Sequence, residues 1–272
     1  MELWDIIEST LISKIYRGLW HFTEVAVKEI DIPLETPELQ QQFQSYVENW
    51  YSLRHPHIIP LLGASITHNI PYVVMPFLSK GNLVQYLENN LDIPHLISII
   101  LDISSGMQYL HSRQLIHGEL MASNILIDNY GEPSICDLGF SKYFYFSSLS
   151  NNKSTNSTME DGQSTLIRTN NSYINRKINR YIRWTANEIQ DNYIYTFASD
   201  VYSFGMLCYE IFSGGDVPFS DIPENIIPEA VKSGRRPSRP SGCPDEIWSL
   251  MQKCWDINPD KRPTFYEISQ NL

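Results

Sequence analysis

The sequence lacks the cysteine patterns of disulfide-stapled or zinc-bound domains. It has 272 residues but only four cysteines, and no two of them have the spacing of a metal-binding pair. Four is also few for a stapled secreted domain of this size. We therefore expect a reducing, cytoplasmic location. The four residues are Cys136, Cys208, Cys243 and Cys254.

Basic residues and long apolar runs are scarce as well. Lys and Arg number 20 against 31 Asp and Glu, which gives a formal net charge of -11 and a pI near 5.0. This charge disfavours broad electrostatic binding to nucleic acid or anionic membrane. The start, Met1–Asp5, is acidic where a signal peptide is basic, and no apolar run approaches membrane-spanning length. We expect neither nucleic acid nor membrane as a partner.

The chain has enough apolar residues for a large core. Hydrophobic residues make up 42% and aromatic residues 12% of the sequence. Residues 24–30 alternate in the manner of a strand. Thr36-Pro37-Glu38 predicts the start of a helix that ends before Pro56, with apolar residues at spacings of three and four. A second strand pair is predicted over 58–66 and 72–75.

The second part of the sequence is helical in character. Apolar positions from Leu96 to Leu110 predict a long amphipathic helix, and 201–212 is apolar on nearly every side, as in a central buried helix. Thr264 and Glu267 have capping-box spacing for a final helix. A small strand-rich part followed by a larger helical part predicts an α+β fold.

One segment departs from this pattern. Residues 147–172 are dominated by Ser, Thr and Asn and contain few large apolar groups, so we expect a disordered loop there. Its triplet Asn156-Ser157-Thr158 matches a glycosylation site. For a cytoplasmic protein we interpret that match as chance.

Several motifs, taken in order, resemble the protein kinase superfamily and its tyrosine-kinase-like branch, from about Ser13 to Leu272. The resemblance implies a bilobal kinase fold, with residues 1–78 as the N-terminal lobe and hinge and 79–272 as the C-terminal lobe. The disordered loop of 147–172 would be an insertion in the activation segment. The motifs are Val25–Lys28, Leu53–Ile59, His117–Asn124, Asp137–Gly139, Ser199–Gly205 and Cys254–Pro263.

This resemblance implies ATP and Mg²⁺ as ligands. Lys28 matches the lysine that contacts the α- and β-phosphates, and Asn124 and Asp137 match the two protein ligands of magnesium. Two simpler interpretations stay open: Lys28 as a solvated strand lysine, and Asn124 and Asp137 as residues that cap turns. The expected nucleotide-binding residues are Ile15, Ala26, Lys28, Met75 as the gatekeeper, Pro76 and Leu78 in the hinge, and Leu126.

Other positions depart from the family pattern in the small lobe. Tyr46 stands where a helix glutamate would pair with Lys28, and we expect it to be a packing residue more than a new ligand. The nearest acid, Glu48, lies about 200° around the helix. The stretch 8–15, which matches the glycine-rich loop, has no glycine, and Glu8 would lie close to a triphosphate.

The catalytic loop departs too. Gly118 replaces the arginine that docks a phosphorylated activation loop. Glu119 replaces the aspartate base, and a shift of about 1 Å in such a group can lower the rate on the order of 100-fold. Met121 replaces the phosphate-neutralising lysine, a loss of about 3 kcal/mol. On the substrate side Asn187 replaces a proline and Tyr181 replaces a threonine.

Two packing roles are also implied by the resemblance. Glu188 should form an ion pair with Arg262, and Asp200 should hold the catalytic-loop backbone.

Two main hypotheses follow. The first is a pseudokinase that binds a protein partner, such as an active kinase or its substrate. The second is a weakly active ATP-dependent serine/threonine or tyrosine kinase in which Glu119 acts as the base and Glu48 or another acid pairs with Lys28. A degenerate product without ligand or partner is a third, less favoured interpretation.

Overall fold

The computed structural model describes residues 2–10, 13–31, 33–89, 91–138, 181–192 and 195–272. The expected disordered loop of 147–172, its Asn156–Thr158 triplet and Gly139 lie outside these residues. Among the described residues, no helix combines the length and apolar character needed to cross a bilayer.

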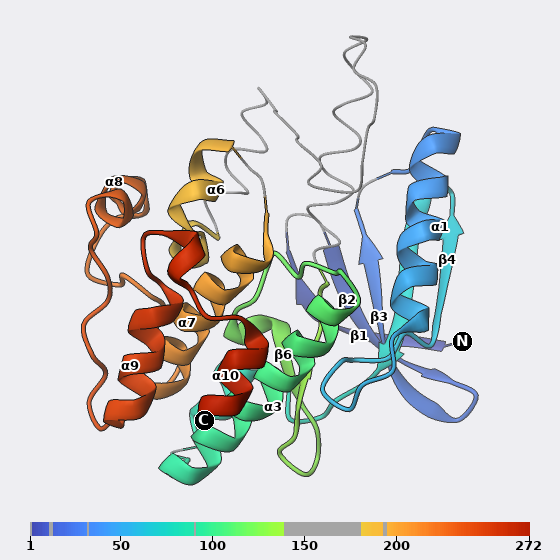
Figure 1. Cartoon of the computed structure of the whole chain (residues 1–272). Helices are drawn as coiled ribbons and strands as arrows, with labels where there is room; N and C mark the ends of the chain where they lie inside the picture. Colours follow the sequence, from blue (N-terminus) through green and yellow to red (C-terminus); the bar gives the residue numbers. More distant parts are fainter. Residues whose placement is uncertain (1, 11–12, 32, 90, 139–180, 193–194) are drawn as a thin grey trace, which may run out of the picture.

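The N-terminal part is an antiparallel sheet with one helix beside it (Figure 1). Within the described residues the sheet has five strands in the order β1-β2-β3-β5-β4. Helix α1 follows β3, and its Thr36 cap accepts a hydrogen bond from the Leu39 amide at 3.3 Å, as the sequence predicted. The bounds are β1 Glu2–Ser9, β2 Ser13–Trp20, β3 Thr23–Ile30, α1 Pro37–Ser52, β4 Gly63–Thr67 and β5 Ile70–Pro76.

Strand β3 shows the period of two that directs side chains to opposite faces of a sheet. Val25 and Val27 pack in a small cluster on one face, whereas Ala26 and Ile30 belong to the main core on the other. Lys28 has the same parity as Ala26 and Ile30. It therefore points to the face that α1 covers.

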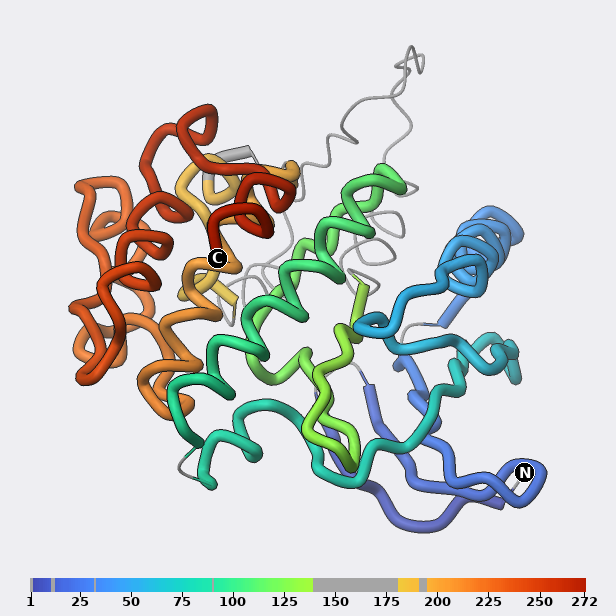
Figure 2. Tube along the Cα trace, turned by 60° about the horizontal axis from the view of Figure 1, so that its bottom comes forward, coloured from blue at the N-terminus to red at the C-terminus, as the bar shows by residue number. Residues whose placement is uncertain are grey.

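The C-terminal part is mainly helical (Figure 1). Figure 2 shows α3 running between the sheet side and the later helices. Helix α7 is buried along nearly its whole length, as predicted, but begins four residues before 201 because Thr196 and Ser199 form a capping box. The bounds are α2 Leu83–Leu87, α3 Ile93–Ser112, β6 Ile125–Ile127, β7 Pro133–Ile135, α6 Asn187–Asn192, α7 Phe197–Phe212, α8 Ile227–Lys232, α9 Asp245–Cys254 and α10 Phe265–Asn271.

One predicted strand is wrong in its first half. Strand β4 begins only at Gly63, and the residues before it are not part of the five-stranded sheet. Ile58 instead forms an isolated parallel bridge with Ile135 of β7, and Ile58 and Ile59 are buried against the main core. Their apolar character comes from this packing, and Pro56 and Pro60 break the segment.

Candidate functional site

A cleft lies where the sheet meets the helical part. Its volume is about 640 Å³, and residues from β1, β2, β3, β5, β6 and the segments beside them form its walls. Nine of the ten predicted site residues line it: Ile15, Ala26, Lys28, Met75, Pro76, Leu78, Asn124, Leu126 and Asp137. The tenth, Glu119, lines a different and much smaller cavity.

Lys28 is paired inside this cleft and is not a solvated strand lysine. The residue is 9% exposed, and its Nζ contacts Oδ1 of Asp137. Burial disfavours the ammonium, but the Asp137 carboxylate outweighs that effect, and Glu119 adds to it, so the pKa of Lys28 is raised. Lys28 is therefore a cation held between acidic side chains.

The helix beside Lys28 presents Tyr46 near these carboxylates. Tyr46 is partly buried against the main core, and its ring lies 5.9 Å from that of Trp50 in an edge-on contact. Burial, then the carboxylates of Asp137 and Glu119, raise the pKa of its hydroxyl well above the usual value. Glu48 is exposed on another side of α1, where it accepts a hydrogen bond from Gln44 at 2.9 Å. The idea that Glu48 pairs with Lys28 is therefore wrong.

The two predicted metal-binding residues, Asn124 and Asp137, are held in defined positions. Asn124 donates from Nδ2 to the Glu119 carbonyl oxygen at 2.7 Å, and its own carbonyl accepts from the Cys136 amide at 3.0 Å. Asp137 has a φ of 57°, in the left-handed region that few non-glycine residues adopt. Such strain persists where the surroundings fix it, and it is common at functional sites.

Asp200 holds the backbone at the start of the loop formed by residues 117–124. It is fully buried, and its carboxylate accepts hydrogen bonds from the backbone amides of His117 at 2.8 Å and Gly118 at 2.7 Å. The Glu119 amide donates to Nδ1 of His117, so Nε2 carries the ring proton and donates to the Cys136 carbonyl at 2.9 Å. The predicted structural role of Asp200 is confirmed.

Gly118 has a φ of 73°, which is also left-handed. A side chain at this position would strain the backbone by about 1–2 kcal/mol. An arginine could therefore not simply be restored here.

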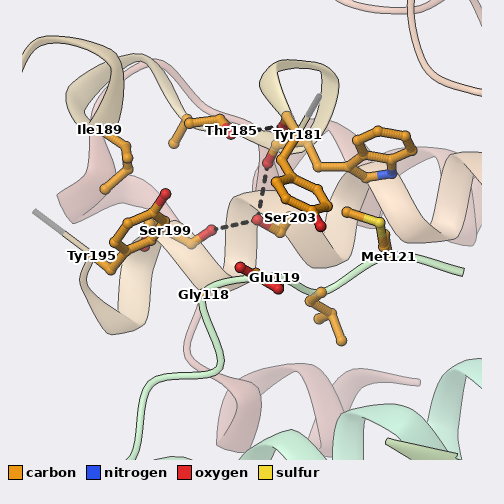
Figure 3. Close-up of a pocket in the computed structure, with 12 residues that line it drawn as sticks. Gly118, Glu119, Met121, Tyr181, Thr185, Ile189, Tyr195, Ser199 and Ser203 are labelled. Carbon is orange, nitrogen blue, oxygen red and sulfur yellow. Dashed lines mark hydrogen bonds between the residues drawn. The ribbon is translucent and has the colours of Figure 1, made fainter. Parts of the chain in front are cut away.

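Glu119 and Met121 line the small cavity together. Both are buried, at 4% and 5% exposure. Figure 3 shows them around a cavity of about 10 Å³, which Tyr181 and Ser203 also line. Ser203 donates to the carbonyls of Trp184 at 2.9 Å and Ser199 at 3.1 Å, and Thr185 to that of Tyr181 at 2.7 Å. Met121 also reaches the large cleft, so an apolar thioether lies between the two spaces.

The hairpin β1–β2 covers the opposite side of the cleft. Its strands pair as far as Ser9 and Lys14, and the Thr10 amide donates to the Ser13 carbonyl at 2.8 Å. Glu8 lines the cleft. A carboxylate therefore lies on this wall of the cleft.

Sequence reasoning missed Glu210, which also lines the cleft. This residue of α7 is 2% exposed, and its carboxylate accepts from the Ala122 amide at 2.9 Å and Trp184 Nε1 at 2.8 Å. Burial raises its pKa to about 8 despite these two donors. An acid within the mostly apolar stretch 201–212 of α7 was the available signal.

The predicted ion pair between Glu188 and Arg262 is present. Arg262 donates to both carboxylate oxygens of Glu188, at 2.5 and 3.0 Å. The arginine side chain has no exposed surface. This bidentate pair fixes the segment after Trp184 to the loop before α10.

A model described as protein tyrosine and serine/threonine kinase matches residues 2–272, so the chain belongs to this kinase family. It is 33% identical to a probable serine/threonine-protein kinase of Dictyostelium discoideum, over 96% of this chain and 18% of that protein. It is 31% identical to human tyrosine-protein kinase Fer, over 98% and 31%. The mouse megakaryocyte-associated tyrosine-protein kinase is 30% identical, over 95% and 46%.

The chain thus spans less than half the length of each of these relatives. It is a protein kinase domain with an N-terminal antiparallel sheet and a helical C-terminal part. Members of this family generally use ATP and Mg²⁺ and act on protein substrates.

Proposed function

We propose that this kinase domain is a pseudokinase: it binds ATP weakly, transfers phosphate poorly or not at all, and signals by binding a protein partner, either an active kinase or that kinase's substrate. The observation that carries this proposal is the pairing of Lys28 with Asp137. In the family the lysine pairs with a helix glutamate and the aspartate holds metal. Here Tyr46 occupies the helix position, and the lysine takes up the carboxylate that magnesium needs.

Nucleotide binding is supported by the cleft itself. A volume of about 640 Å³ lies within the range of small-molecule sites. Ile15, Ala26 and Leu126 offer apolar walls for adenine, and the Pro76 carbonyl remains able to accept a hydrogen bond. Asn124 and Asp137 offer the oxygen ligands that Mg²⁺ prefers, and Lys28 would compete with the metal for the Asp137 carboxylate. When bound, the metal nucleotide would supply the phosphoryl group.

Phosphate transfer is opposed by three features of the same site. The Glu119 side chain lies at the small cavity, Met121 offers no positive charge, and Glu8 lines the wall above. Each of the first two changes lowers the rate on the order of 100-fold, although the effects need not add. Ordinary kinases turn over at about 1–100 per second. The expected residual rate is close to the limit of detection.

A second candidate function is a weakly active ATP-dependent serine/threonine or tyrosine kinase. It is favoured by the meeting of Lys28, Asn124 and Asp137 in one cleft, with Asp137 held at a strained φ of 57°. The acid that pairs with Lys28 is Asp137 and not Glu48. In this alternative Glu119 takes the proton of the substrate hydroxyl.

Two assays on the purified chain separate these functions. Thermal unfolding with ATP, with and without Mg²⁺, measures binding, because a ligand at a hundredfold excess over Kd stabilises by about 2.7 kcal/mol. Incorporation of labelled phosphate into tyrosine-containing and serine/threonine-containing peptides measures transfer. The pseudokinase expectation is a thermal shift without incorporation above that of Asp137→Asn. Robust incorporation that Glu119→Gln abolishes would contradict it and support the active kinase.

Two further proposals concern the boundary between the lobes and the location of the protein in the cell. We place the division between the lobes after Leu78, since β5 ends at Pro76 and α2 begins at Leu83. A cytoplasmic location suits the four cysteines, each of which is free and buried.

A further inference from the structure

A second group of polar side chains lies away from the cleft. His57 belongs to the segment between α1 and β4, Asp102 to α3, and Glu132 directly precedes β7. One ligand atom from each of the three lies within 4.8 Å of the others. The kinase reaction described above does not involve any of them.

The hydrogen bonding of His57 fixes which ring nitrogen is free. Nδ1 lies 3.0 Å from the carbonyl oxygen of Pro133. A carbonyl can only accept, so Nδ1 must carry the proton, and in the neutral ring Nε2 presents a lone pair. This nitrogen faces Oδ1 of Asp102 at 3.3 Å. With the ring neutral, two electron-rich atoms face each other, and a cation between them, either a second ring proton or a metal ion, would stabilise the arrangement.

The separation of these two atoms is compatible with a metal ion between them. A charge-assisted N–H···O bond to a carboxylate is usually about 2.7–2.9 Å long, which is shorter than the observed separation. Two ligands of a tetrahedral zinc ion, each about 2.0–2.1 Å from the metal, lie about 3.3–3.4 Å apart. The observed 3.3 Å between Nε2 and Oδ1 matches the second value.

We propose that His57, Asp102 and Glu132 form a zinc site, with water as the fourth ligand. An imidazole whose other N–H donates to a backbone carbonyl is the usual form of a metal-binding histidine. One imidazole with two carboxylates suits Zn²⁺, whereas Mg²⁺ and Ca²⁺ prefer oxygen ligands alone.

The backbone around this zinc site is tightly packed, which holds the two partly buried ligands, His57 and Asp102, in place. The Ile135 amide donates to the His57 carbonyl at 2.9 Å, and the Ile59 amide donates to the Ile135 carbonyl at 3.0 Å. On α3, a Cβ added to Gly106 would lie 3.1 Å from the His57 carbonyl and 2.8 Å from Ile135 Cδ1. Glu132 is exposed and leaves a path for the ion. A bound zinc ion would cross-link the segment after α1, through His57, to α3, through Asp102.

Calorimetric titration of the full chain with ZnCl₂, after removal of bound metal with a chelator, tests this site. We expect one equivalent of zinc to bind. His57→Asn keeps an N–H able to reach Pro133 but lacks Nε2, and we expect it to weaken binding by at least about 10-fold. Glu132→Gln changes an exposed side chain without threatening the fold and should also weaken binding. Glu246→Gln, an exposed acid on α9, is the matched control and should bind as the wild type does.

Three results would overturn the zinc site. The first is no binding by the wild-type chain, and the second is equal affinity in the wild type, His57→Asn and Glu132→Gln. The third is loss of the zinc signal in Asp137→Asn while His57→Asn retains it, because the ion would then occupy the cleft.

Discussion

Lys28 in β3 and Asp137, 109 positions later in the chain, form an ion pair that joins the sheet to the segment after β7. The two partners differ in their access to water. The lysine side chain is 11% exposed and the aspartate side chain 28%. Each can therefore be removed with a different consequence for stability.

The first prediction concerns this asymmetry. Asp137→Asn leaves a nearly buried ammonium without its anion and should lower the free energy of unfolding by about 1–3 kcal/mol. Lys28→Met should cost less, because the remaining carboxylate keeps contact with solvent. Asparagine tolerates the left-handed φ at 137, so the comparison isolates the charge. Urea unfolding of both single variants and the double variant gives the coupling; independent, additive effects would refute the pairing.

A second prediction concerns pH and Glu210. Its folded pKa of about 8 lies above the unfolded value of 4.5, so the native state binds the extra proton between these two values. Stability should fall as the pH rises through this window, by up to about 1.4 kcal/mol per pH unit, and level off above it. Glu210→Gln keeps an acceptor for Ala122 and Trp184 but cannot ionise. A plot of unfolding free energy against pH should be flatter for this variant, and parallel curves would contradict the assignment.

The third prediction tests the support of the catalytic loop. Asp200→Asn leaves one carbonyl oxygen where two backbone amides, of His117 and Gly118, now find a carboxylate. One amide is then left without its acceptor, which should destabilise the fold by about 1–3 kcal/mol. Asp245→Asn is the control, since its side chain is 87% exposed and surface changes stay within about 0.5 kcal/mol. Equal midpoints in urea for the two variants would argue against the role of Asp200.

Much of this architecture could be predicted from the sequence, for local reasons. The caps at Thr36 and Thr264 and the apolar stripe of α3 depend on neighbouring residues alone, and the structure has all three. The first half of the strand predicted over 58–66 was wrong because burial against β7 gives the same apolar signal as a strand. Local pattern cannot separate these two causes.

The candidate site shows a similar limit. The resemblance supplied the residues that line the cleft, but the contact of Lys28 with Asp137 depends on how distant segments pack, as do the burial of Glu210 and the position of Glu119 at the small cavity. None of these relations is a property of spacing. These three relations become visible only in the three-dimensional structure.

The last prediction restores the missing chemistry. If Glu119 and Met121 limit phosphate transfer, the double variant Glu119→Asp, Met121→Lys should raise magnesium-dependent incorporation on the order of 100-fold or more over the wild type. Met121 reaches the large cleft, so a lysine there can place its ammonium near a bound phosphate. Met121→Leu in the Glu119→Asp background is the matched control, because it fills the same space without a charge.

Adding Asp137→Asn to the restored variant should remove the gain, since transfer would still need the metal ligand. A double variant no faster than the Leu control would show that other departures dominate, and Tyr46 beside Lys28 would then be the next position to change. Robust phosphate incorporation by the wild type, equal to that of the restored variant, would contradict the pseudokinase proposal itself. Gly118 is left unchanged in all of these variants, because its φ of 73° disfavours any side chain.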